Sequence, residues 1–209
     1  ARSSDGFYGI GETIGFYPIG RGVDGKVVNY AGSTESDFLL TGNLDWNITD
    51  KINITIWEYY ADNVFNTTYV KPAVSLSDKW SIAGEWLHQF RVGDGGSPYD
   101  SLRYFADRTS NVLGAEVSWT AAKKSKFSIG YDRILDGGRF LFPREWGREF
   151  LFSFQKRERS EGSADNHALV LTYDQQIKLG NSNLRSIASV GRHWKADLTN
   201  AADNKYAVP

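Results

Sequence analysis

Apolar and polar residues alternate along several segments of this chain, most clearly over residues 80–90. The even positions of that segment are Trp80, Ile82, Gly84, Trp86, His88 and Phe90. Alternation with a period of two predicts a β-strand with one apolar and one mostly polar face. Ten residues at ~3.3 Å each, tilted by about 45°, climb roughly 23 Å, close to the ~25 Å apolar band of an outer-membrane barrel. The segment is typical of a membrane-spanning strand, and an aromatic-rich strand of a soluble sandwich is the alternative.

The same alternation recurs before and after this segment. It covers residues 38–48, 52–56, 68–76, 113–121 and 127–131. Short polar turns, Asp50-Lys51, Asp78-Lys79 and Lys123-Lys124, join some of these segments, whereas long connections, 91–111 and 134–149, join others. Short turns at one rim and long loops at the other are typical of a transmembrane barrel. We therefore predict an all-β fold, an up-and-down antiparallel β-barrel with the three turns at its periplasmic rim and the two loops at the opposite rim.

The alternation also predicts which way the side chains point. The residues expected to face lipid are Trp46, Ile54, Trp80, Ile82, Trp119, Phe127 and Ile129. The residues expected to face the lumen are Glu85, Glu116, Ser118, Ser128 and Asp132.

The composition narrows the function. The 209 residues allow one all-β domain, and no run approaches the ~20 apolar residues of a spanning helix. A net charge of −1 with scattered Lys and Arg argues against a nucleic-acid partner. The chain has no cysteine, its three histidines lack a paired metal-binding spacing, and no Gly-x-Ser-x-Gly elbow is present. We expect no catalytic site, no metal site, no cofactor and no enzymatic activity.

A basic segment, residues 139–162, is the candidate functional feature. Its arginines are Arg139, Arg144, Arg148, Arg157 and Arg159. Alternation from residue 150 predicts a strand whose phenylalanines face lipid and whose Arg157 and Arg159 face the lumen, about 6–7 Å apart. Guanidinium groups at that spacing could pass a carboxylate-bearing solute from one to the next. The alternative is that these arginines pair with neighbouring glutamates and hold the loop in place.

The residues of this segment resemble a known family. Phe142-Pro-Arg-Glu-Trp-Gly-Arg-Glu149, then Arg157-Glu-Arg159 and Glu161-Gly162, are similar to the loop-and-strand signature of the OprD family of Gram-negative outer-membrane channels. The resemblance is strong from about Asn111 onward and general before it, and residues 1–36 match nothing. It implies an 18-stranded barrel for passive uptake of small carboxylates and amino acids, with a basic ladder along the lumen. Compared residue by residue, the resemblance implies that Arg157 and Arg159 belong to that ladder, and it extends less closely to Arg144 and Arg148.

The length departs from this family. The pattern gives about nine strands over residues 37–194, or ten to eleven with the N-terminal region, whereas 18 strands need nearly twice the chain. We interpret residues 1–209 as a single barrel domain that is an incomplete portion of a larger barrel, with open sheet edges and the family's constriction loop in the other portion.

The predicted function is a substrate-selective outer-membrane channel for small carboxylate-bearing solutes or amino acids. Its expected partners are those solutes and outer-membrane lipid, in a monomer or a trimer. A soluble β-sandwich that binds carbohydrate is the alternative.

Overall fold

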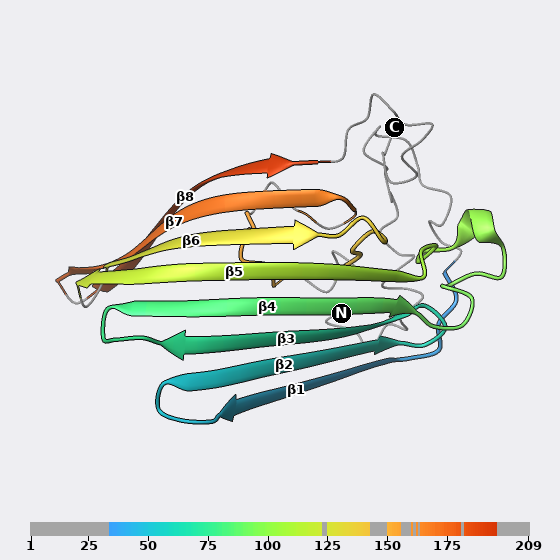
Figure 1. The fold of residues 1–209 in the computed structure, drawn as a ribbon, viewed down its shortest axis with the longest axis horizontal. Coiled ribbons are helices and arrows are strands. Elements are labelled where there is room, and N and C mark those ends of the chain that lie inside the picture. Colours follow the sequence, from blue (N-terminus) through green and yellow to red (C-terminus); the bar gives the residue numbers. More distant parts are fainter. Residues whose placement is uncertain are drawn as a thin grey trace.

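One curved antiparallel sheet dominates the computed structural model, which describes residues 34–122, 125–142, 150–155, 160, 162, 164–180 and 182–195. Its strands are β1 (Leu39–Asn47), β2 (Ile52–Ala61), β3 (Phe65–Ser75), β4 (Trp80–Arg91), β5 (Thr109–Ala122), β6 (Ser125–Ile134), β7 (Asn166–Leu179) and β8 (Ser182–Trp194). A single short helix, η1 (Asp100–Leu102), lies between β4 and β5. The strands follow one another in chain order across the sheet (Figure 1). No helix in the described part of the chain is long and apolar enough to span a membrane.

This topology confirms the predicted all-β, up-and-down antiparallel arrangement. All eight strands belong to one sheet, and the described residues form no second sheet, so the sandwich alternative is wrong for this part of the chain. Within the described ranges, β1 pairs only with β2 and β8 pairs only with β7, so the sheet is open at both edges, as predicted.

The two faces of the sheet carry the residues that the alternation assigned to them. Trp46, Trp80 and Ile129 are 56%, 47% and 51% exposed on the outer face, and the other predicted outward residues share that face. Glu85 and Asp132 are 4% and 1% exposed on the opposite, inner face. Ser118, Glu116 and Ser128 lie on the inner face as well. The orientation predicted from the sequence is therefore confirmed.

Aromatic side chains border the outer face. At the turn side, Trp80 stacks on Trp119, Trp119 on Phe127, and Phe127 on Tyr173, with ring centroids 6.1, 5.7 and 4.6 Å apart. At the loop side the aromatic and histidine contacts are Phe38–Tyr60, Trp86–His88–Phe90 and Tyr131–His167–Trp194. Aliphatic residues in register, such as Ile82, Val117 and Ile129, lie between. An apolar band between two aromatic borders is the lipid-facing surface of a membrane barrel.

The connections fall on two opposite rims, as predicted. The β1–β2 and β3–β4 turns lie at the left edge of Figure 1, and the β4–β5 and β6–β7 connections lie at the right. The hydroxyls of Thr49 and Ser77 each accept hydrogen bonds from the backbone N–H groups two and three residues later, which fixes both turns. Lys123-Lys124 lies outside the described residues, although β5 ends and β6 begins at the left edge. At the loop rim, the β2–β3 connection is short.

The predicted strand from Phe150 onward is wrong for residues 150–155, and the described ranges contain eight strands where about nine were predicted. Residues 150–155 have no strand structure, and the ring of Phe150 stacks on the inner-face residues Trp57 and Tyr69. Phe150 packs on an apolar patch of the inner face, and Phe152 and Phe154 line a cavity on the same face, so these phenylalanines do not face lipid.

We expect Ile129→Lys to destabilise the folded protein by about 2–4 kcal/mol, because a lysine on the lipid face between the aromatic borders loses its hydration. Ser128→Lys is the matched control, since residue 128 lies next to it but faces the inner side. Equilibrium unfolding of the full-length protein in lipid bilayers measures the difference. Equal destabilisation by both variants would contradict the membrane assignment of the outer face.

Candidate functional site

The inner face carries an apolar row that is unexpected in a polar lumen. Tyr69, Leu87, Val112 and Ile134 are paired in register across β3, β4, β5 and β6. All are at most 2% exposed, because Phe140, Phe142 and Leu151 of the β6–β7 connection pack on them. The connection therefore folds inward over the sheet. This feature was missed from the sequence, although apolar residues at inner positions of four neighbouring strands are the signal that could have found it.

Phe150 is the centre of the aromatic contacts in this cluster. Its ring centroid lies 5.7 Å from that of Trp57, 5.6 Å from Tyr69 and 6.0 Å from Tyr59. It also meets the ring of Phe142 edge-on at 5.9 Å. Such stacked and edge-on pairs add to the stabilisation from burial alone, so the connection is held firmly against the wall.

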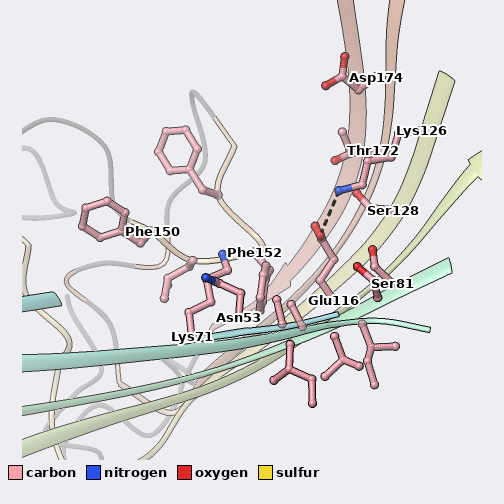
Figure 2. Close-up of a pocket in the computed structure, with 18 of the residues that line it drawn as sticks. Asn53, Lys71, Ser81, Glu116, Lys126, Ser128, Phe150, Phe152, Thr172 and Asp174 are labelled. Carbon is pink, nitrogen blue, oxygen red and sulfur yellow. Dashed lines mark ion pairs between the residues drawn. The ribbon is translucent and has the colours of Figure 1, made fainter. Parts of the chain in front are cut away.

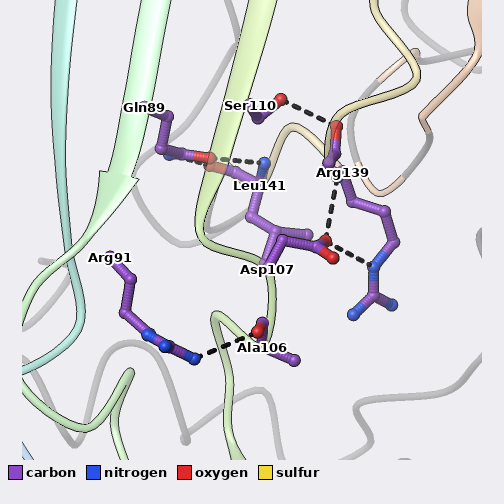
Figure 3. Close-up of polar contacts among 8 residues, drawn as sticks. Gln89, Arg91, Ala106, Asp107, Ser110, Arg139 and Leu141 are labelled. Atoms are coloured by element: carbon purple, nitrogen blue, oxygen red, sulfur yellow. Dashed lines mark hydrogen bonds and ion pairs between the residues drawn. The ribbon is translucent and has the colours of Figure 1, made fainter.

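Polar contacts tie the first half of the connection to the strands (Figure 3). The side chain of Gln89 donates to the carbonyl of Leu141 at 2.8 Å and accepts from its N–H at 3.0 Å, as a neighbouring strand would. The hydroxyl of Ser110 donates to the carbonyl of Gly138 at 3.0 Å. Arg139 donates its backbone N–H to Asp107 at 3.0 Å, and its guanidinium pairs with the same carboxylate at 3.5 Å. Arg139 thus serves as a loop tie.

Two buried carboxylates tie the second half. Glu85 accepts a hydrogen bond from the N–H of Phe152 at 3.2 Å and another from the hydroxyl of Tyr69 at 2.7 Å. Asp132 accepts from the N–H of Ser153. The tyrosine hydroxyl also contacts the carbonyl of Phe150 at 3.3 Å. Residues 150–153 are therefore bound to the wall through their backbone.

Beyond residues 150–155, toward the turn rim, the inner face is hollow. A cavity of about 910 Å³ lies between this segment and the sheet (Figure 2). Its described lining carries four cationic and three anionic side chains. Lys126 pairs with Glu116 at 3.7 Å, Arg185 forms a bidentate pair with Asp174, and Lys71 lies 3.9 Å from the ring centroid of Phe152. The charges of the cavity wall are therefore nearly balanced.

A row of hydroxyl groups crosses the wall of this cavity. Its members, paired in register from β3 to β8, are Ser75, Ser81, Ser118, Ser128, Thr172 and Ser189. Hydroxyls both donate and accept hydrogen bonds, so they can replace part of the hydration of a passing solute without fixing its charge. This part of the inner face is suited to an aqueous path.

Of the predicted basic residues, Arg144, Arg148, Arg157 and Arg159 lie outside the described residues. The ends of their segments are described, however. Phe142 and Phe150, which flank residues 143–149, contact each other through their rings on the inner face. Residues 156–159 begin after Gln155 and end before Ser160, and both of these contact the imidazole of His193, at 3.4 and 3.5 Å. The described ranges contain no group of three or more His, Asp or Glu residues that could hold a metal ion.

Solved structures of other proteins share this architecture, although no sequence comparison found a match. No protein-family model and no curated protein matches the sequence. Among solved structures, OpdN and OpdR of Pseudomonas aeruginosa match with TM-scores of 0.61, at 14% and 15% identity, over 78% and 81% of this chain and 44% and 45% of theirs. The outer membrane protein OprD from Pseudomonas aeruginosa matches with a TM-score of 0.59 at 13% identity, over 81% of this chain and 43% of that one.

The chain spans less than half the length of each of these proteins. Its eight strands in one open sheet correspond to part of their barrels, and the inward β6–β7 connection lies on the inner side. The described part of this chain has the fold of the OprD-type outer-membrane β-barrels, which confirms at the level of fold the resemblance carried by residues 142–162.

Proposed function

We propose that this protein is part of an outer-membrane channel through which small polar solutes diffuse passively. The observation that carries the proposal is the contrast between the two faces of one sheet. The outer face is apolar with aromatic borders, and the inner face is polar, hollow and narrowed by a connection packed against it. A single-layer sheet with these faces is stable only when lipid covers one side and water the other.

The near balance of positive and negative charges on the cavity wall supports passive diffusion of a solute over its tight binding. A solute must enter and also leave, so a conducting path needs contacts that are favourable but weak. Paired charges such as Lys126–Glu116 and a row of hydroxyls offer such contacts. The fold is that of outer-membrane channel proteins, and it gives no support to an enzymatic reaction.

We further propose that the passage favours carboxylate-bearing solutes or amino acids because Arg157 and Arg159 face it, joined by Arg144 and Arg148. The inward orientation of Arg157 and Arg159 was predicted from a strand that begins at Phe150. Residues 150–155 form no strand, so the support comes from the contacts of the residues on either side of 156–159. His193 lies on the inner side of β8 and contacts both ends of the segment that holds Arg157 and Arg159. The contacts of the flanking residues Gln155 and Ser160 with the inner wall are what supports this proposal. Arg139 pairs with Asp107 at 3.5 Å, and its predicted role in the solute path stays a prediction.

Channel activity predicts that liposomes containing the full-length protein swell in isotonic solutions of small amino acids and carboxylates and remain stable in large oligosaccharides. The reason is that the hollow inner face is narrowed by the β6–β7 connection. The rate of light-scattering decrease measures uptake, with heat-denatured protein as the control. An absence of swelling with every small solute would contradict the channel.

The selectivity proposal predicts that Arg157→Ala/Arg159→Ala shifts the reversal potential of the full-length protein toward cation selectivity and slows carboxylate uptake. Two fixed positive charges beside a confined path act more strongly than charges in bulk water. The matched control is Arg192→Ala, because Arg192 lies on the outer face of β8 beside the ring of Trp194. The measurement is the reversal potential across a planar bilayer under a salt gradient. An unchanged reversal potential in the double variant would contradict the selectivity proposal and indicate that these arginines only hold the loop in place.

A further inference from the structure

We propose that Glu85 and Asp132 are positioning residues that hold the Leu151–Ser153 segment against the inner wall and so set the width of the solute passage. The inference rests on the proposed channel function and assigns to it two residues that do not bind the solute. Both side chains are almost fully buried, at 4% and 1% exposure, although each carries a carboxylate. Burial of polar or charged groups is costly unless they are hydrogen-bonded, so these two residues need a specific role.

The partners of these carboxylates point to that role. Glu85 binds the N–H of Phe152, and Asp132 binds the N–H of the next residue, Ser153. Because the segment is not a strand, these two N–H groups have no neighbouring strand as partner, and the carboxylates supply the acceptors instead. Breaking either hydrogen bond would leave a buried polar group without a partner, so both bonds favour the docked position of the segment. The wall therefore binds the backbone of the segment at two consecutive residues.

A glycine between the carboxylates makes this arrangement possible. The register pairs Glu85 with Gly114 on β5, and Gly114 with Asp132 on β6, so the three residues form one cross-strand row. A Cβ atom at residue 114 would lie 2.1 Å from Oδ1 of Asp132 and 2.7 Å from Oε1 of Glu85. The carboxylates converge over the space that the missing side chain leaves. Any larger residue at this position would push them away from the segment.

A second glycine shows how closely the segment approaches the wall. A Cβ atom at Gly130 would lie 2.9 Å from the Cβ atom and 2.9 Å from the carbonyl oxygen of Phe152. The backbone of the segment thus lies directly on β6. Phe150, Phe152 and Phe154 of the same segment also line the hollow part of the inner face. Movement of this segment away from the wall would change the cross-section of the path.

The inference predicts a measurable loosening in Glu85→Ala/Asp132→Ala. Loss of both acceptors should raise hydrogen–deuterium exchange of the peptide spanning residues 150–155 roughly 10- to 100-fold in the full-length protein. In planar bilayers, the unitary conductance should change and slow current fluctuations should appear. Asp45→Ala is the matched control, because Asp45 lies on the inner face of β1, accepts a hydrogen bond from the hydroxyl of Thr55 and is not among the residues that line the cavity.

Gly114→Ala provides a second variant that removes no charge and still displaces both carboxylates. We expect it to reproduce the exchange and current changes in the same direction. Should the double alanine variant fail to fold, as judged by heat-modifiable migration on gels, this variant carries the test alone.

Gly130→Ala tests whether the segment itself mediates the effect. A Cβ atom at this position would meet the Cβ atom and the carbonyl oxygen of Phe152 at 2.9 Å, so it displaces the segment while Glu85 and Asp132 keep their side chains. We expect it to raise exchange of residues 150–155 and to change the currents in the same direction as the double alanine variant.

The outcomes separate the two proposals. A wild-type channel whose conductance and segment exchange are unchanged by both the double alanine variant and Gly114→Ala would overturn the positioning role and leave the channel function standing. A wild-type protein that carries no current in bilayers would overturn the channel function, and the role in setting a passage with it. Increased exchange and altered currents in the double alanine variant, in Gly114→Ala and in Gly130→Ala, with both unchanged in the control, would support both.

Discussion

Backbone hydrogen bonding within one sheet is the constraint on which the rest of this structure depends. Lipid offers no partners for N–H and C=O groups, so each strand in the membrane must pair with a neighbour on both sides. From β1 to β8 this pairing is continuous and in register, and it places every second residue on the same face. The lipid-facing aromatic borders, the hydroxyl row and the buried carboxylates all follow from that register.

The inner face shows how a polar wall can hold a folded connection. An apolar row from Tyr69 to Ile134 gives the connection a surface on which Phe140, Phe142 and Leu151 lose contact with water. Burial of these side chains favours docking but does not fix its position, because hydrophobic contacts are non-directional. Direction comes from polar groups at both ends of the row. Gln89 binds the backbone of Leu141, and Glu85 and Asp132 bind that of residues 152 and 153.

The proposed passage and the contacts that hold its wall lie in different parts of the inner face. Aromatic stacking and the buried carboxyl groups lie between the connection and the strands. The hollow region toward the turn rim is lined by hydroxyl groups and paired charges. Substitutions in the hollow region can therefore alter the proposed passage while the contacts beneath the connection stay in place.

The sequence by itself determined the strands, their faces and their order, because period-two alternation and short polar turns are local properties. It correctly oriented residues as far apart as Trp46 and Ile129, and Glu85 and Asp132. The sequence did not show whether Phe150 contacts lipid or an apolar row on the inner face, because the same alternation of residues suits both. It therefore predicted a strand where a connection folds inward. Only the tertiary structure decided that fold, because it depends on four strands bringing Tyr69, Leu87, Val112 and Ile134 into one row. It also decided that Glu85 and Asp132 meet over Gly114, a contact between residues 47 positions apart that no local pattern records.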